Sequence, residues 1–447
     1  MLAANMSLPA FAENNTDSAD FDAYVQTEFE KTHIPGMSVQ IVDKDSVLFA
    51  QTYGNCDSLD DGFIIGSLSK SFTAVCIMQL VEQGKLSLSD PISKYLSEEN
   101  QESKTTVLQL LNQTSGIKTY DTVEKHSLSD VPVEFEYANV NYGLLGKIIE
   151  NVSGEDYSTY IQKNVFDPLG MEQSFTSLEK AKSSGMTPGN RNYFGFFKES
   201  EYAYPDNSYT GWITVPAGYI ISSTNDMGRY MQMYLNGGAN ILQKTSVDEM
   251  MFNSVNFEGG YKYGMGLGTT QSSSGGLMVV HGGNVENYTT YMIMMPEQNI
   301  ALIAMFNGCD YFVANEMAVK LAINSLSKYR GVGEKTLDEN TYRNSHLLIN
   351  VIFLVLLIIA VLPLILFKRW RTKNVTESKK RGILLTCLIH AVLPSIILAI
   401  PVLISTPMAV VKGFVPDVFI ILILSSGILY LTGLIKLICY IRGAKQK

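Results

Sequence analysis

The chain has 447 residues, enough for two or three domains of about 150 residues each. Its formal net charge is −9, and residues 1–345 alone hold 22 Lys and Arg against 41 Asp and Glu. A nucleic-acid-binding protein needs a basic face, so this balance excludes nucleic acid as an expected partner. The apolar fraction of 46% and the mean hydropathy of +0.09 are high for a water-soluble protein, and the excess lies near the C-terminal end.

The five cysteines are too scattered to predict a disulfide framework or a zinc cluster; they are Cys56, Cys76, Cys309, Cys387 and Cys439. The five histidines include no H-E-x-x-H pair. We therefore expect neither a metal ion nor an organic cofactor.

The N-terminal residues allow two interpretations. Residues 8–12 end in an A-x-A-like site, as a signal peptide does, but no basic segment precedes them and the apolar core is short. The segment is either a truncated signal peptide or an ordinary loose terminus. We favour a truncated signal peptide followed by a loose segment, together covering residues 1–20.

The first regular elements are a helix and a hairpin. Residues 21–30 can form a helix, and apolar residues then alternate with polar ones over 37–41, the period of a half-buried strand. Asp43, Lys44 and Asp45 turn the chain into a second apolar run over 47–50, which completes the predicted hairpin.

Ser67 and Lys70 stand three residues apart at the head of an apolar helix predicted over 72–81. Residues at this spacing share one helix face, and a buried lysine is costly unless it is neutralised or paired. The amine would then lie within reach of the serine hydroxyl and could activate it. The alternative is that Ser67 only caps the helix, since serine is favoured at that position.

The region from 72 to 175 is predicted to be mostly helical, with clear helical spacing over 143–151 and 157–165. Tyr137 and Asn139 lie just before the first of these two helices. A lysine ammonium nearby would favour the ionised phenolate of Tyr137, which could then take a proton from Ser67. Asn139 offers a donor and an acceptor to a substrate amide or to Lys70.

Residues 178–216 are irregular, and a helix resumes over 226–235. The irregular part is rich in aromatic residues, which either wall a substrate pocket or simply pack a long loop. They are Tyr193, Phe194, Phe196, Phe197, Tyr202, Tyr204, Tyr209 and Trp212.

The alternating glycines Gly264, Gly266 and Gly268 do not predict a nucleotide site, because the strand–turn–helix context and the downstream acid are missing. Beyond them, His281-Gly282-Gly283-Asn284 follows an apolar strand over 277–280. Glycines at a strand end allow a close backbone approach. The N–H groups of Asn284 and Ser67 could therefore converge as an oxyanion hole.

Two further strands, over 290–295 and 300–306, and a helix over 312–326 close this part of the chain. Strands at both ends and helices between them predict one sheet built from the two chain ends, covered by a helical insertion. The polar stretch 329–345 is expected to be a linker.

Three apolar segments, 347–367, 383–404 and 418–441, are each long enough to cross a bilayer. The loop between the first two is strongly basic, and the tail 442–447 is basic as well. Positive loops stay in the cytoplasm, so the N-terminal part is expected on the extracytoplasmic side of the cell membrane.

Ser67-x-x-Lys70, Tyr137-x-Asn139 and His281-x-Gly283, in this order, resemble the serine β-lactamase-like and penicillin-binding hydrolases, most closely the class C-type branch. The resemblance also includes residues 112–117, 167–171 and 217–224. It implies an α+β fold, an antiparallel sheet flanked by helices with a helical subdomain, over residues 21–328. The three spans, within 346–441, lie outside the shared domain.

The resemblance also implies roles. Ser67 would be the acylated nucleophile, and Lys70 and Tyr137 would share the proton transfers. Asn139 and His281 would bind substrate, as would Gly283 and Asn284. Many members of the family carry lysine where this chain has His281, and those with histidine include peptidases and esterases acting on D-amino-acid substrates.

We therefore expect a membrane-anchored extracytoplasmic serine hydrolase that acts through an acyl-enzyme on an amide or ester. Its substrate would be a cell-envelope molecule, for example one containing a D-amino acid. Two alternatives are a true β-lactamase and an acylable ligand sensor that signals through the spans.

Overall fold

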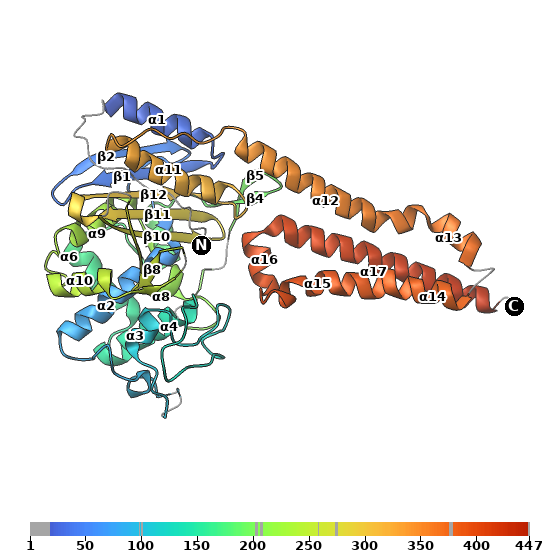
Figure 1. Ribbon diagram of the computed structural model, residues 1–447, viewed down its shortest axis with the longest axis horizontal. Coiled ribbons are helices and arrows are strands. Elements are labelled where there is room, and N and C mark those ends of the chain that lie inside the picture. Colours follow the sequence, from blue (N-terminus) through green and yellow to red (C-terminus); the bar gives the residue numbers. More distant parts are fainter. Residues whose placement is uncertain are drawn as a thin grey trace. The chain divides into compact units, whose positions relative to one another are not determined.

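A computed structural model describes residues 18–97, 99, 102–201, 204–205, 209–257, 259–272, 276–374 and 379–445. Of the predicted signal peptide and loose segment over 1–20, residues 1–17 lie outside the described residues, and residues 18–20 are not loose but begin the first helix. The chain divides into two compact units (Figure 1). The N-terminal unit runs to Glu339 without Asn192–Phe196, and the second unit contains Asn192–Phe196 and the chain from Asn340 onward.

An eight-stranded antiparallel sheet forms the centre of the N-terminal unit, in the order β2-β1-β12-β11-β10-β9-β8-β7. The strands are β1 (Gly36–Val42), β2 (Val47–Gly54), β7 (Val255–Asn256), β8 (Lys262–Gly264), β9 (Leu267–Gln271), β10 (Leu277–Val285), β11 (Tyr288–Met295) and β12 (Ile300–Phe306). β1 pairs with β12, so that Val39 stands opposite Ala304. The predicted α+β fold, with one sheet built from the two ends of this unit, is confirmed.

Shorter strands pair outside this sheet. β3 (Phe63–Ile64) pairs with β6 (Ile221–Ser222), and β13 (Gly308–Cys309) pairs with β4 (Asn190–Tyr193), which is followed by β5 (Phe196–Glu199).

Helices cover both faces of the large sheet (Figure 1). On one face lie α1 (Ser18–Glu30) and α11 (Ala314–Tyr329), where Phe21 packs edge-on against Phe49 and Tyr329. On the other face lie α2 (Ser69–Glu82), α9 (Thr224–Leu235) and α10 (Lys244–Phe252). The helical subdomain adds α3 (Val107–Leu111), α4 (Asn139–Ser153), α5 (Tyr157–Ile161), α6 (Asp167–Leu169), α7 (Leu178–Ser184) and α8 (Val215–Gly218).

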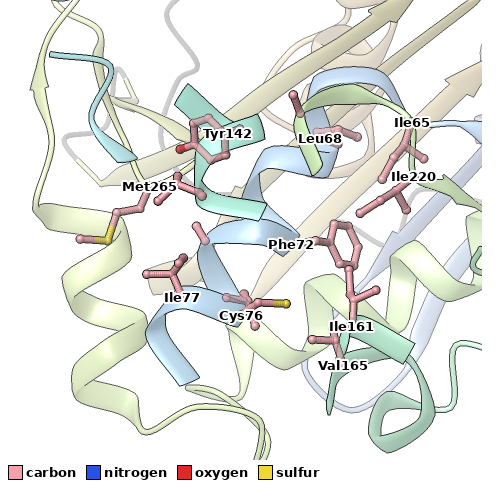
Figure 2. Close-up of a cluster of buried hydrophobic side chains, with 14 of the residues drawn as sticks. Ile65, Leu68, Phe72, Cys76, Ile77, Tyr142, Ile161, Val165, Ile220 and Met265 are labelled. Atoms are coloured by element: carbon pink, nitrogen blue, oxygen red, sulfur yellow. The ribbon is translucent and has the colours of Figure 1, made fainter. Parts of the chain in front are cut away.

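The α2 helix runs through the middle of the hydrophobic core, as Figure 2 shows. All of its residues from Ser69 to Leu80 are buried, which explains why the predicted helix is apolar on every side. Phe72 stacks on Tyr230 with 3.7 Å between ring centroids, and Tyr142 of α4 packs in the same cluster. The helix that carries the candidate nucleophile and base is therefore held rigidly by packing.

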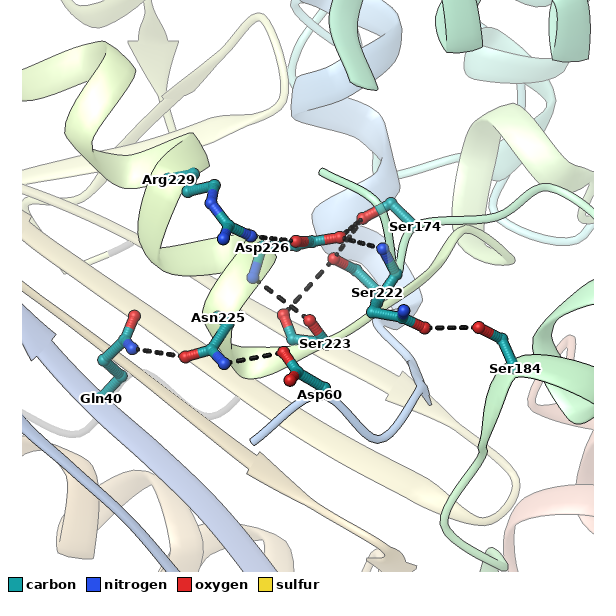
Figure 3. A network of polar contacts seen from close by, with 10 residues as sticks. Gln40, Asp60, Ser174, Ser184, Ser222, Ser223, Asn225, Asp226 and Arg229 are labelled. Carbon is teal, nitrogen blue, oxygen red and sulfur yellow. Dashed lines mark hydrogen bonds and ion pairs between the residues drawn. The ribbon is translucent and has the colours of Figure 1, made fainter. Parts of the chain in front are cut away.

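A buried polar network fixes the start of α9 (Figure 3). The Asp226 carboxylate accepts hydrogen bonds from the Gln173 backbone N–H at 2.7 Å and from Ser174 Oγ at 2.9 Å. It also pairs with Arg229, whose Nη1 lies 2.6 Å from Asp226 Oδ1. Next to it, Asn225 Oδ1 accepts from Gln40 of β1 at 2.9 Å. Because these groups tie the helix to the sheet and to residues 173–174, we assign the network a structural role.

Two sequence predictions need correction. Residues 112–138 contain no helix, although the region was predicted to be mostly helical. The loop is instead held by bonds to Gln113, whose φ is +60° and whose carbonyl accepts from the Glu136 N–H at 3.0 Å. The last helix of the unit begins at Ala314, not at 312, because the Asp310 carboxylate holds the preceding residues in a turn by accepting from the N–H groups of Phe312 and Ala314.

The second unit contains α12 (Thr341–Ile365), α13 (Phe367–Asn374), α14 (Lys379–Cys387), α15 (Leu393–Leu403), α16 (Met408–Phe414) and α17 (Pro416–Lys445). Among the described residues, three helical stretches are long and apolar enough to cross a membrane, as predicted: Thr341–Ile365, Gly382–Leu403 and Pro416–Arg442. The first of them begins inside the expected linker. Within this bundle, His390 contacts the carbonyl of Leu429 at 3.0 Å and the Lys436 amine at 2.8 Å.

Candidate active site

Ser67 lies in a tight turn that leads directly into α2. A short 3₁₀ turn over Gly66–Leu68 precedes the helix, and Gly66 has a φ of +55°, which favours glycine. The turn is closed by Ser69, whose hydroxyl donates to the Gly66 carbonyl at 2.7 Å and accepts from the Ile220 N–H at 3.1 Å. The N-cap of α2 is Leu68 and no side chain caps the helix, so the capping alternative for Ser67 is wrong.

Lys70 makes three polar contacts from a fully buried position. Its Nζ lies 2.7 Å from Asn139 Oδ1, 2.6 Å from the Ala217 carbonyl oxygen and 3.2 Å from Ser67 Oγ. A neutral amine has two N–H groups and one lone pair. Since the two closer partners can only accept, the amine in its neutral form would direct its lone pair toward the Ser67 hydroxyl.

The electrostatics differ from the prediction of a lysine ammonium beside a phenolate. Burial lowers the pKa of the Lys70 amine well below its ordinary value. Burial also raises the pKa of the Tyr137 phenol, against smaller opposite effects of the Ser67 and Tyr263 hydroxyls. Desolvation outweighs the charge–charge attraction that the sequence suggested, so both groups favour their neutral forms.

Tyr137 stands just before α4, and Asn139 is the first residue of that helix. Lys70 Nζ lies 4.8 Å from the centre of the Tyr137 ring, so the structure brings Ser67, Lys70 and Tyr137 together. The Tyr137 hydroxyl oxygen is buried and has no hydrogen-bond partner within the described residues. In a free enzyme, catalytic hydrogen bonds are often long or poorly aligned, and they shorten when substrate binds.

β10 runs past this group and continues to Val285, so His281, Gly283 and Asn284 lie inside the strand and not beyond its end. The pairing between β10 and β11 continues through the glycines, since Gly282 lies opposite Tyr291 and Gly283 opposite Thr290. A Cβ on Gly66 would lie 2.6 Å from the Asn284 backbone nitrogen, which shows how closely β10 passes the turn of Ser67.

His281 is 2% exposed and electrically neutral. Burial lowers its pKa to about 3, and Lys70 adds to this shift only in its protonated form. Its Nδ1 lies 2.8 Å from the Gly282 carbonyl oxygen, which can only accept, so Nδ1 carries the proton. The buried Nε2 is then an acceptor without a partner in the described part of the chain.

Tyr263 is a site neighbour that the sequence analysis missed. Its ring centre lies 5.8 Å from that of Tyr137 and 5.7 Å from that of His281, both edge to face. The available signal was the run of alternating glycines that begins at Gly264, which brings this turn close to the rest of the chain.

The aromatic residues of 193–212 do not form one cluster. The Tyr204 ring packs on that of Tyr219, and the Tyr209 hydroxyl donates to the Glu150 carboxylate at 3.1 Å. The ring centres of Trp212 and Tyr120 lie 5.5 Å apart. Phe194 belongs to the second unit, and Tyr202 lies outside the described residues. Most of these residues therefore pack loops locally.

In the described ranges of the chain, no group of three or more His, Cys, Asp or Glu side chains could hold a metal ion. The chemistry available at the site is that of a hydroxyl, an amine, a phenol and a neutral imidazole. This set suits nucleophilic attack with general acid–base catalysis.

The comparisons with known proteins agree with this geometry. The family described as Beta-lactamase matches residues 21–322. Protein flp of Staphylococcus aureus is 25% identical over 431 residues, which cover 87% of this chain and 84% of that protein. The octameric penicillin-binding protein homologue from Pyrococcus abyssi has a TM-score of 0.61 at 28% identity, over 71% of this chain and 78% of that one. D-alanine carboxypeptidase AmpC from Burkholderia cenocepacia shares the fold, with a TM-score of 0.58 at 21% identity, over 70% of this chain and all of that one.

Proposed function

The chain belongs to the β-lactamase family of serine hydrolases, and we propose that it is an active, membrane-anchored member. It hydrolyses an amide or ester through an acyl-enzyme formed on Ser67. The observation that carries the proposal is the set of Lys70 contacts. Two acceptors hold its N–H groups, and the lone pair of the amine is left for the hydroxyl of Ser67.

Acylation then proceeds with all protons accounted for. Ser67 Oγ bonds to the substrate carbonyl carbon while its proton passes to Lys70 Nζ, and the electron pair of the C=O bond moves onto the oxygen. The N–H groups of Ser67 and Asn284 stabilise this oxyanion. When the bond to the leaving nitrogen or oxygen breaks, Tyr137 donates its phenolic proton to the leaving atom and regains one from the Lys70 ammonium.

Deacylation repeats the sequence with water as the nucleophile. Water attacks the acyl carbon and gives a proton to Lys70, and the departing Ser67 oxygen takes that proton back. The neutral pair formed by Lys70 and Tyr137 supports this cycle, because a base must be free of its proton before the attack and an acid must hold one.

The proposed substrate class is supported by His281. As a neutral acceptor, its Nε2 favours a substrate N–H over a carboxylate, which a lysine at this position would attract. We therefore place peptide-like and ester substrates with a D-amino acid or another cell-envelope group ahead of β-lactams. Rapid and complete hydrolysis of a chromogenic cephalosporin by the purified chain would reverse this order.

A second candidate is a sensor that is acylated and signals through the membrane. It is favoured by the three apolar helices, since a single span would be enough for anchoring. Stable acylation of Ser67 without turnover on any ester, amide or peptide would support the sensor. Steady turnover would exclude sensing as the sole role.

The basic loop between the first two spans supports a catalytic unit on the extracytoplasmic side. In intact cells, a membrane-impermeant thiol reagent should label Lys244→Cys, an exposed position on α10, and spare Lys373→Cys in the basic loop. The opposite labelling pattern would reverse the proposed topology.

Intact-mass spectrometry after treatment with a fluorophosphonate or penicillin probe tests the proposed chemistry. We expect one adduct on the native chain and none on Ser67→Ala. Ser46→Ala, in the exposed turn between β1 and β2, is the matched control and should be labelled like the native chain. Equal labelling of Ser67→Ala and the native chain would contradict the proposal.

A further inference from the structure

The turn between β8 and β9 is pressed against the start of α2. Gly266 has a φ of +77°, and a Cβ there would lie 2.5 Å from the Ser71 nitrogen and 2.6 Å from the carbonyl carbon of Lys70. The Met265 N–H donates to the Leu111 carbonyl at 3.1 Å, which fixes the other side of the turn. The alternating glycines thus hold this turn against the residues that carry the candidate base.

This close approach places Tyr263 in the wall of the site. The residue is 2% exposed, and its ring meets both Tyr137 and His281 edge to face. Phe135 packs on the same ring at 5.3 Å. Tyr263 therefore contacts both the proposed acid and the proposed substrate-binding histidine.

The Tyr263 hydroxyl is a buried polar group without a direct hydrogen-bond partner in the described part of the chain, and the same is true of the Tyr137 hydroxyl. An unmade hydrogen bond of this kind is costly in a protein interior. The polar side chains that face the Tyr263 hydroxyl are Gln113, Tyr137 and Tyr142.

Two of these three neighbours are already engaged elsewhere. The Tyr142 hydroxyl donates to the Leu111 carbonyl at 2.8 Å, and Gln113 Oε1 accepts from the Ala138 N–H at 3.1 Å. The free Nε2 of Gln113 can donate toward the Tyr263 oxygen. The Tyr137 and Tyr142 oxygens could both accept the Tyr263 proton, but within the described residues the Tyr137 hydroxyl is the one that lacks any hydrogen-bond partner, so it gains most from accepting.

We propose that Tyr263 is a positioning residue for Tyr137: during turnover its hydroxyl donates to the Tyr137 oxygen and aims the phenolic proton of Tyr137 at the leaving group. The inference rests on the proposed hydrolase function. The electrostatics support the geometry, because the Tyr263 hydroxyl lowers the pKa of Tyr137 against the effect of burial and so makes it a better acid.

Steady-state kinetics of Tyr263→Phe on an activated ester, with the full chain in detergent, test the proposal. We expect kcat to fall about tenfold or more with little change in KM, because a hydrogen bond to the acid is lost and substrate contacts are kept. Tyr234→Phe is the matched control, since it also removes a fully buried phenol hydroxyl, but one bonded to Tyr230. Its kcat and KM should both remain close to the native values.

A double-mutant cycle shows whether Tyr263 acts through Tyr137. In the Tyr137→Phe background, Tyr263→Phe should change the rate of fluorophosphonate labelling by less than about twofold. A native kcat for Tyr263→Phe, or additive effects in the cycle, would overturn the inference. If the native chain is labelled at Ser67 and turns over substrate, either of these results would refute the role of Tyr263 but not the proposed function. If the native chain is not labelled specifically at Ser67, both the proposed function and the role of Tyr263 are refuted.

Discussion

Gly283 of β10 lies directly against the carbonyl of Ile65, two residues before Ser67. A Cβ built on Gly283 would overlap the Ile65 carbonyl oxygen and the Thr290 hydroxyl, which itself donates to that carbonyl at 2.9 Å. The strand and the nucleophile turn therefore touch through backbone atoms. This is why a strand can supply an N–H group beside the serine.

Gly283→Ala should accordingly be harmful, whereas Gly282→Ala should be tolerated. Overpacking at a backbone contact costs about 1–3 kcal/mol, and the displaced turn should slow probe labelling of Ser67. A Cβ on Gly282 would find its nearest neighbour at 3.5 Å, an ordinary contact. Thermal unfolding and labelling rates of both variants test the pair; equal behaviour of the two would contradict the close approach.

Lys70→Arg should nearly abolish activity although it keeps a positive charge. An arginine side chain cannot lose its proton, so no lone pair would face Ser67. We expect kcat/KM for an ester to fall by about 10²–10⁴. In the native chain, activity should rise with pH as Lys70 loses its proton, and this limb should lie below the ordinary lysine range because burial lowers the pKa of Lys70.

The control for this substitution is Lys163→Arg, an exposed lysine paired with Glu155 at 2.7 Å. It should retain native rates. Retention of more than a tenth of the native rate by Lys70→Arg would mean that another group is the base.

His281 should make the protein less stable in acid. Its pKa is about 3 in the folded state and about 6.5 in an unfolded chain, so between these values only the unfolded chain takes up the proton. The contribution of the neutral His281 to the free energy of unfolding is therefore fully present above pH 6.5. It is lost as the pH falls through this window, by up to about 1.4 kcal/mol per pH unit. His281→Asn should show a flatter dependence of the unfolding midpoint on pH.

The matched control is His33→Asn, since His33 is exposed and has a φ of +58°, which asparagine tolerates. This variant should keep the native slope. A native slope in His281→Asn as well would show that the imidazole is protonated in the folded state.

Local sequence patterns predicted much of the fold. The alternation over 37–41 and the apolar runs at 290–295 and 300–306 marked β1, β11 and β12, and the apolar stretch after Ser67 marked the buried α2. The prediction that β1 is half-buried is wrong, because α9 covers its second face and buries Ser38 and Gln40 as well. The signals for the elements themselves are short-range, since they depend on the pattern of neighbouring residues.

Other features depend on tertiary contacts and were not accessible from the sequence. β10 continues through Gly282 and Gly283 because β11 pairs with it, which overrides the low strand preference of glycine. The neutral states of Lys70 and Tyr137 follow from desolvation, which depends on burial by distant segments. Tyr263 reaches the site only because the following turn packs on α2.

His281→Lys should improve labelling by penicillins. The native imidazole is neutral and accepts a hydrogen bond, whereas a lysine ammonium at this position would attract the penicillin carboxylate. A charge-assisted hydrogen bond is stronger than a neutral one by about 1–2 kcal/mol, which corresponds to about a tenfold faster acylation by benzylpenicillin. The added cation would also face Lys70 and favour its neutral, reactive form.

His281→Gln and a neutral ester separate the carboxylate effect from any general activation. The glutamine variant, which adds no charge, should be labelled by benzylpenicillin no faster than the native chain. With an uncharged ester, His281→Lys should show no comparable gain, because no carboxylate is present to bind. Unchanged or weaker penicillin labelling of His281→Lys would mean that the missing cation does not limit β-lactam recognition at this site.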